Sequence, residues 1–234
     1  MKKRFLILLL ALVPLAASAQ RSDLGDNRLI LVTNGTGTVD FAVLGHVGYG
    51  FHIVTQSEFE PRGVLCGELF VNLVKLSLAP LDNLGVDLGI DFKYNHFNAK
   101  KAAFMLDAEH KVQAVPFADF AGGDVSRNSA RINILGFSAP LLVKGVISGL
   151  AVGIGAEVGL NVWGSVRDSY QLGERRYSVM EPNARVSTFT YGFIADVSFY
   201  GLSIYAKFYP RSMRTLQEGS TALHYWTIGV AFGF

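Results

Sequence analysis

Residues 84–97 read LGVDLGIDFKYNHF, and their alternation indicates the fold more directly than any other stretch of the chain. Every second residue is apolar, and the residues between them are glycine, charged or polar. Strict alternation over this length is typical of a β-strand that has one apolar and one polar face. The apolar face comprises Leu84, Val86, Leu88, Ile90, Phe92 and Tyr94, and the polar face comprises Gly85, Asp87, Gly89, Asp91, Lys93 and Asn95.

The same alternation recurs along the chain and predicts eight strands in all. The other predicted strands begin near Val39, Leu65, Arg131, Leu150, Thr188, Leu202 and Leu223. In the strand from Arg131 to Lys144 the register stays open, because Pro140 and its apolar neighbours blur the alternation. An even number of strands is what a single-chain bacterial barrel requires.

The composition indicates a membrane protein without a membrane helix. Half of the 234 residues are hydrophobic, only 17% are charged, and the mean hydropathy is +0.31. A helical span needs about 20 apolar residues, and after the N-terminal segment the best candidate is a short, glycine-containing run between Lys144 and Glu157. A closed β-barrel is the other structure that lipid tolerates. We therefore predict an all-β fold, an eight-stranded antiparallel up-and-down transmembrane barrel formed by residues 39–234.

The N-terminal residues MKKRFLILLLALVPLAASAQ predict export. Three basic residues precede an apolar core, and Ala17-Ser18-Ala19 forms a small-residue cleavage site, so residues 1–19 are interpreted as a signal peptide. The predicted location is the bacterial outer membrane. Residues 20–38 are expected to form a periplasmic segment or a plug in the lumen, although Leu29–Thr33 could also be a strand. Short connections at APLDN, KGVISG and Tyr200-Gly201 are assigned to the periplasmic side, and the long connections to the outside.

Charged residues on the inward faces are the most informative candidates for a site. An eight-stranded barrel has an interior just wide enough for side chains to fill, and buried charges must be paired there. The interpretation we favour is a lumen closed by salt bridges, and the alternative is a path for a solute. The predicted inward charges are Glu68, Asp87, Asp91, Lys93, Arg131, Glu157, Asp196 and Lys207.

Glycine and histidine patterns are interpreted as structural. Gly153, Gly155 and Gly159 share the inward face of one strand without a following helix, so they are expected to make room for side chains across the lumen and not to bind a nucleotide. His46 and His52 lie six residues apart on one strand, roughly 20 Å. They cannot bind one metal ion together, and hydrogen-bonded lumen histidines are expected.

Two further features are weighed in the same way. Cys66 is the only cysteine, so no internal disulfide can form, and it is expected to be a small buried residue. Asp107, Glu109 and His110 lie in a long connection. They are the groups that an enzyme at the barrel rim would need, but solvated charge is the favoured interpretation. No catalytic residue, metal site or cofactor is predicted.

The last strand carries an apolar stripe that is expected to face lipid. The stripe comprises Trp226, Ile228, Val230, Phe232 and Phe234. It resembles the last strand of bacterial outer-membrane proteins, whose terminal aromatic residue is read by the barrel-assembly machinery. The stretch INILGFSAPLLVKG, residues 132–145, is similar to the "PLLLKY" strand of the PorT-like outer-membrane β-barrel family. That resemblance implies the barrel fold, and some members of such families act in protein secretion.

These observations predict a non-enzymatic outer-membrane protein that acts through its outer loops or as an envelope interaction protein. The alternatives are a PorT-like accessory of protein secretion, a rim-type outer-membrane enzyme and a small-solute channel. The expected partners are outer-membrane lipid, the barrel-assembly machinery and other envelope or secretion proteins. A formal charge of +2 and the absence of a basic run argue against nucleic acid.

Overall fold

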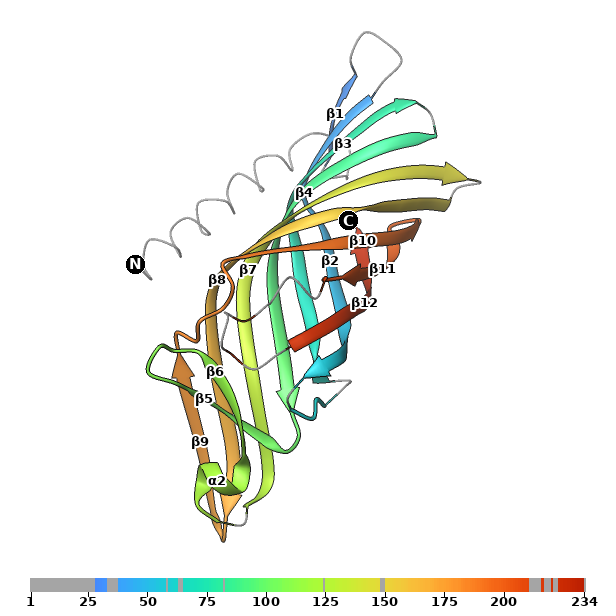
Figure 1. The fold of residues 1–234 in the computed structure, drawn as a ribbon. Coiled ribbons are helices and arrows are strands. Elements are labelled where there is room, and N and C mark those ends of the chain that lie inside the picture. Colours follow the sequence, from blue (N-terminus) through green and yellow to red (C-terminus); the bar gives the residue numbers. More distant parts are fainter. Residues whose placement is uncertain are drawn as a thin grey trace.

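Eight antiparallel strands close into a ring in this computed structural model (Figure 1). The structure describes residues 28–32, 38–57, 59–62, 65–81, 83–123, 125–147, 150–210, 216, 220 and 223–233. The ring strands are β2 (Thr38–Ser57), β3 (Gly67–Leu81), β4 (Leu84–Ala99), β7 (Val125–Ile147), β8 (Leu150–Leu172), β10 (Phe189–Phe199), β11 (Leu202–Phe208) and β12 (Leu223–Gly233). Each pairs with the next in the chain, and β12 pairs with β2. The all-β, up-and-down architecture predicted from the sequence is thereby confirmed.

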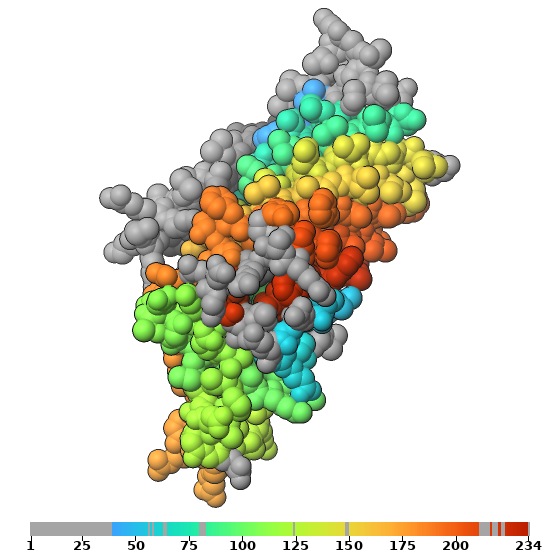
Figure 2. Space-filling model, in the orientation of Figure 1, coloured from blue at the N-terminus to red at the C-terminus, as the bar shows by residue number. Residues whose placement is uncertain are grey.

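The two ends of the ring differ. At one end, which we call the short-turn end, brief connections join β3 to β4, β7 to β8 and β10 to β11. At the opposite end β7 and β8, each of 23 residues, continue far past their neighbours (Figure 1). They carry β9 (Arg175–Pro182), the hairpin of β5 (Ala102–Leu106) and β6 (Val112–Pro116), and the short helix α2 (Phe117–Ala121). We call this part the extension, and Figure 2 shows it as a lobe at the end of the ring.

The strand β1 (Arg28–Val32) pairs with the first residues of β2, Thr38–Ala42. It lies on the same side of β2 as β12, which pairs with β2 only from His46 onward. This pairing places β1 in the wall of the ring, in line with β12. The predicted signal peptide, the rest of residues 20–37 and the terminal Phe234 lie outside the described residues.

Side chains are distributed opposite to those of a water-soluble protein. Large apolar side chains are exposed on the outside of all eight ring strands, among them Phe51, Ile154, Val158, Phe193 and Ile204. Glu68, Lys93, Glu157 and Lys207 are instead fully or almost fully buried inside the ring. The alternation seen in the sequence therefore places apolar residues outward and charged residues inward. Among the described residues no helix is long and apolar enough to cross a membrane.

Candidate functional site

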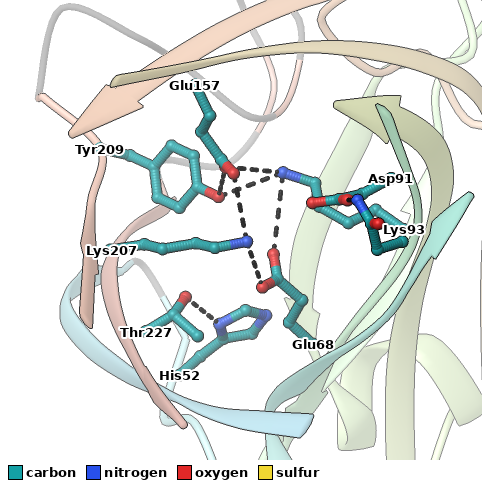
Figure 3. Close-up of polar contacts among 9 residues, drawn as sticks. His52, Glu68, Asp91, Lys93, Glu157, Lys207, Tyr209 and Thr227 are labelled. Atoms are coloured by element: carbon teal, nitrogen blue, oxygen red, sulfur yellow. Dashed lines mark hydrogen bonds and ion pairs between the residues drawn. The ribbon is translucent and has the colours of Figure 1, made fainter. Parts of the chain in front are cut away.

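Two lysines and two glutamates meet in the middle of the lumen (Figure 3). Lys207 Nζ lies 2.7 Å from Glu68 Oε1 and 3.1 Å from Glu157 Oε2. Lys93 Nζ lies 2.9 Å from Glu157 Oε1 and 3.7 Å from Glu68 Oε2. The four side chains come from β3, β4, β8 and β11, so the cluster ties together strands from around the ring. Each cation touches both anions, and the four charges sum to zero. We call these four residues the central cluster.

Tyr209 completes the central cluster and was not predicted. Its hydroxyl donates a hydrogen bond to Glu157 and accepts one of 3.1 Å from Lys93 Nζ. The residue lies just after the end of β11, where the inward alternation of Ser203, Tyr205 and Lys207 continues by one step. This continued alternation is the sequence feature from which an inward Tyr209 could have been predicted.

Asp91 and His52 lie next to the central cluster (Figure 3). Asp91 Oδ1 accepts a 2.6 Å hydrogen bond from Asn72 Nδ2. His52 Nδ1 lies 2.9 Å from the hydroxyl of Thr227, and its ring stacks on Phe97 with 4.7 Å between the centroids. This hydrogen-bonded histidine agrees with the interpretation made from the sequence.

A second ion cluster lies nearer the short turns. Lys144 Nζ lies 2.8 Å from Asp196 Oδ2 and 3.2 Å from Asp87 Oδ2. Lys75 Nζ lies 3.0 Å from the same oxygen of Asp87. The predicted residues Asp87 and Asp196 are thus paired by two lysines that the sequence analysis missed. Lys144 was missed because the register around Pro140 was open.

Arg131 does not belong to either cluster, and its predicted inward position is wrong. Its side chain is exposed, and its Nε donates a 3.0 Å hydrogen bond to Asn98 Oδ1. The inward residues on this part of β7 are Ile132 and Ile134, which are fully buried. Since successive side chains of a strand point to opposite faces, Arg131 must point outward.

A cavity of about 80 Å³ separates the two clusters. Its lining includes Asn72, Asp91 and Lys207 on one side and Lys144 and Asp196 on the other. Asn72 Oδ1 and Asp196 Oδ1 are buried without a hydrogen-bond partner in the described part of the chain. A cavity of this size is large enough for a few water molecules. The lumen between the clusters is therefore lined by both polar and apolar side chains, the apolar ones including Phe70, Leu142 and Ile194.

An apolar core fills the lumen at the extension end. Phe97, Phe104, Ile132, Ile134 and Val166 are all fully buried there. Phe104 comes from the β5–β6 hairpin, which packs against β7 and β8. The sequence placed this region in a long outer connection, and this core was not predicted, although the apolar residues of AAFML and VQAVPF were a signal for it.

The hairpin is held to the wall by a buried acid. Asp168 Oδ1 accepts a 2.9 Å hydrogen bond from the amide of Phe104. Burial raises the pKa of Asp168 to about 7 even though this hydrogen bond favours the ionised form, and the nearby carboxylate of Glu181 raises it further. Glu181 itself accepts a 3.2 Å hydrogen bond from the amide of Leu106. Both strands β8 and β9 thus hold β5.

The remaining motifs have structural surroundings. An added Cβ would lie 2.1 Å from Asp196 Oδ1 at Gly153 and 2.4 Å from Thr190 Oγ1 at Gly159. This agrees with the predicted role of these glycines in lumen packing. Cys66 is fully buried, as expected.

The acid and imidazole group lies at the tip of the β5–β6 hairpin. Asp107, Glu109 and His110 are exposed there. Asp107 Oδ1 accepts hydrogen bonds from the amides of Glu109 and Lys111, at 2.8 and 2.9 Å, and Glu109 pairs with the Lys111 side chain. Among the described residues no group of three or more His, Cys, Asp and Glu side chains could hold a metal ion.

The terminal stripe lies on the outside of β12. Trp226, Ile228, Val230 and Phe232 are exposed, and the residues between them are inward or small. Comparison with protein-family models finds no match to this chain, and comparison with curated proteins finds no significant match. The resemblance to PorT-like proteins therefore stays a prediction.

Proposed function

We propose that this protein is a bacterial outer-membrane β-barrel that holds no open pore and acts as an interaction protein through the extension. In this proposal the short-turn end faces the periplasm and the extension stands outside the cell. The short turns at one end support this orientation, and the predicted signal peptide and the apolar outer surface support the membrane location.

A reversal of polarity along β7 carries the proposal. Below the level of Leu135 the outward residues are apolar, as at Leu141 and Val143, and the inward residues include Ser138 and Lys144. Above that level the outward positions hold Asn133, which is buried, and Arg131, which is exposed, and the inward residues are Ala130, Ile132 and Ile134. A wall with apolar residues outside suits lipid, and a wall with apolar residues inside suits water. The reversal along this one strand supports a change of surroundings from lipid to water near Leu135.

Three successive outward rows mark this boundary across β4, β7 and β8. Tyr94, Leu135 and Trp163 form the first row, as the pairing registers place them side by side. The next row is His96, Asn133 and Ser165, and the third is Asn98, Arg131 and Arg167. Asn98, Asn133 and Ser165 are buried at these outward positions, whereas Arg131 and Arg167 are exposed. Aromatic rings followed by polar and then charged groups are typical of a membrane interface. The Tyr94 hydroxyl also donates a 2.7 Å hydrogen bond to Asn133, toward the polar side.

The lumen contents favour a closed barrel. Any solute would have to pass the central cluster, the second ion cluster and the apolar core in turn. Removing one partner of a buried ion pair costs about 3–5 kcal/mol, and the core is made largely of fully buried apolar side chains. The small-solute channel is therefore the less favoured function.

The extension offers a surface for a partner. Among the strands that the structure describes, β9 pairs only with β8, so its other edge presents free backbone groups. Arg176, Ser178 and Met180 on its outward face are exposed. Exposed strand edges are sites at which an extended segment of another protein can add a strand. We infer that the extension contacts envelope or extracellular partners in this way.

Orientation can be tested by labelling whole cells with a membrane-impermeant maleimide. The native cysteine would first be replaced by the Cys66→Ala substitution, and single cysteines introduced by Ser178→Cys on β9 or Asn83→Cys in a short turn. We expect Ser178→Cys to be labelled and Asn83→Cys to be labelled only after the outer membrane is opened. The same protein in a planar bilayer should give no steady conductance. A mainly soluble protein, equal labelling of both sites or a stable open channel would refute the proposal.

A further inference from the structure

Lysines and arginines are used differently in this protein. Each of the lysines that the structure describes forms an ion pair; these are Lys75, Lys93, Lys100, Lys101, Lys111, Lys144 and Lys207. Among the described residues, no arginine has an acidic side chain within ion-pair distance. These arginines are Arg62, Arg127, Arg131, Arg167, Arg175, Arg176 and Arg185, and all of them lie at the extension end. That end therefore presents cationic groups that no carboxylate of the described chain neutralises.

Two of these arginines are direct neighbours. Arg131 of β7 and Arg167 of β8 are opposite each other in the register, and both side chains are exposed. Like charges at directly opposed positions destabilise a sheet. The flanking cross-strand pairs are Ser129 with Ser169 and Asn133 with Ser165, and neither pair contributes an acid. An anion between the two guanidinium groups would remove the repulsion.

The local contacts prepare the pair for an anion. Asn98 Oδ1 accepts the Nε–H of Arg131, which fixes the side chain and leaves the other guanidinium donors available. Planar guanidinium groups bind phosphate oxygens through paired hydrogen bonds. Two exposed guanidinium groups at opposed positions therefore suit a phosphate group.

The position of the two arginines along the strands favours the phosphate of a lipid headgroup. Arg131 and Arg167 lie four residues beyond Leu135 and Trp163, about 13 Å along the strands and less along the membrane normal because barrel strands tilt. The polar layer of each leaflet extends some 5–7 Å past the hydrocarbon, and arginine side chains reach toward their charge partners from outside that layer. The pair thus stands at the level of lipid headgroups if the apolar surface is in lipid.

We propose that Arg131 and Arg167 bind the phosphate group of a phosphorylated lipid headgroup in the leaflet next to the extension. The proposal rests on the proposed membrane location. The lipid chains pack on the apolar surface below the pair, near Leu135 and Trp163, while the phosphate bridges the two guanidinium groups. Such a contact fixes the depth of the barrel and anchors the extension relative to the membrane surface.

The test compares two double variants that remove the same charge. Arg131→Gln with Arg167→Gln alters the pair, and Arg175→Gln with Arg176→Gln alters two other arginines of the extension. Each purified barrel is folded into phosphatidylcholine nanodiscs and titrated with a fluorescent phosphatidic acid. We expect the first double variant to weaken binding at least about tenfold, since two charge-assisted hydrogen-bonding groups are lost, and the second to bind like wild type.

Additional measurements distinguish a lipid site from a site for free phosphate and from nonspecific electrostatic binding. Inorganic phosphate at millimolar concentration should not displace the lipid, because it lacks the chains; full displacement would indicate a free-anion site and overturn the lipid assignment. Equal weakening by both double variants would show diffuse electrostatics and also overturn it, as would unchanged binding by the first. Folding in the nanodiscs is checked by the mobility of unheated samples on gels. A wild-type barrel that fails to insert refutes the membrane location, whereas one that inserts without preferring phosphatidic acid refutes only the lipid site.

Discussion

Replacing Lys207 by methionine should destabilise the barrel through the charges that it leaves behind. In the wild type the central cluster has two positive and two negative charges, and Lys207 contacts both glutamates, at 2.7 and 3.1 Å. In the Lys207→Met variant, Lys93 alone faces Glu68 and Glu157, so one negative charge is buried without compensation. Breaking a buried ion pair in this way typically costs about 3–5 kcal/mol.

A second substitution, Glu68→Gln, should restore part of the stability that Lys207→Met removes. In the double variant Lys207→Met with Glu68→Gln, the contact of 2.9 Å between Lys93 and Glu157 remains, together with Tyr209. One cation and one anion then stay paired, and the cluster is neutral again. Because a neutral replacement of a whole ion pair often changes stability little, the double variant should be more stable than the single Lys207→Met variant.

The measurement is urea unfolding of the barrel in lipid vesicles, followed by tryptophan fluorescence. A loss of about 4 kcal/mol with a urea dependence of about 2 kcal/mol per M lowers the unfolding midpoint by about 2 M. Lys100→Met is the matched control, because Lys100 pairs with Glu60 at the exposed rim and its loss should move the midpoint little. If Lys207→Met unfolds like Lys100→Met, or if the double variant is less stable than both of its single variants, the reasoning about the central cluster is wrong.

Two further predictions concern the extension and the second ion cluster. Burial raises the pKa of Asp168 to about 7, so the stability that its protonated form gives to β5–β6 docking is full below about pH 4 and is lost as pH rises through about 7. Hydrogen exchange of residues 102–116, corrected for intrinsic rates, should therefore accelerate from pH 5 to pH 8 in wild type and not in Asp168→Asn; parallel profiles would contradict this. Gly153→Ala places a Cβ 2.1 Å from Asp196 Oδ1 and should cost about 1–3 kcal/mol of unfolding free energy. Gly145→Ala, whose Cβ would meet nothing closer than 4.0 Å, should cost less, and equal midpoints of the two variants would refute the clash.

Strand alternation predicted the ring and the central cluster because strands with an apolar outer face and a polar inner face repeat with a period of two. Glu68, Lys93, Glu157 and Lys207 follow from parity alone, and the structure brings all four together. Which of them pair could not be predicted, because pairing depends on the shear of the ring, which the sequence does not state. Tyr209 was not predicted because it follows the last residue of β11, although its side chain continues the inward alternation of that strand.

The alternation of inward and outward positions could not predict the extension. Its residues were assigned to long loops, yet β7 begins at Val125, β8 continues to Leu172, and β9 and the β5–β6 hairpin form on top of them. Apolar residues that face outward in the ring face inward here, so a single pattern cannot describe both parts. Arg131 was placed inside for this reason, since a charged residue in a membrane strand is normally inward and one in the extension is outward.

A β-bulge lies where the two patterns meet, and it explains how one strand serves both. On β7 the parity is unbroken, but on β8 Leu135 pairs with Trp163 while Gly136 pairs with Asn161, so Val162 is an extra residue. A one-residue shift moves every later side chain to the other face. Before the bulge the inward residues of β8 are odd-numbered, such as Glu157; after it they are even-numbered, such as Val166. Without the extra residue Val166 would face solvent and Arg167 would enter the apolar core. The bulge therefore allows β8 to carry charge inside within the ring and outside in the extension.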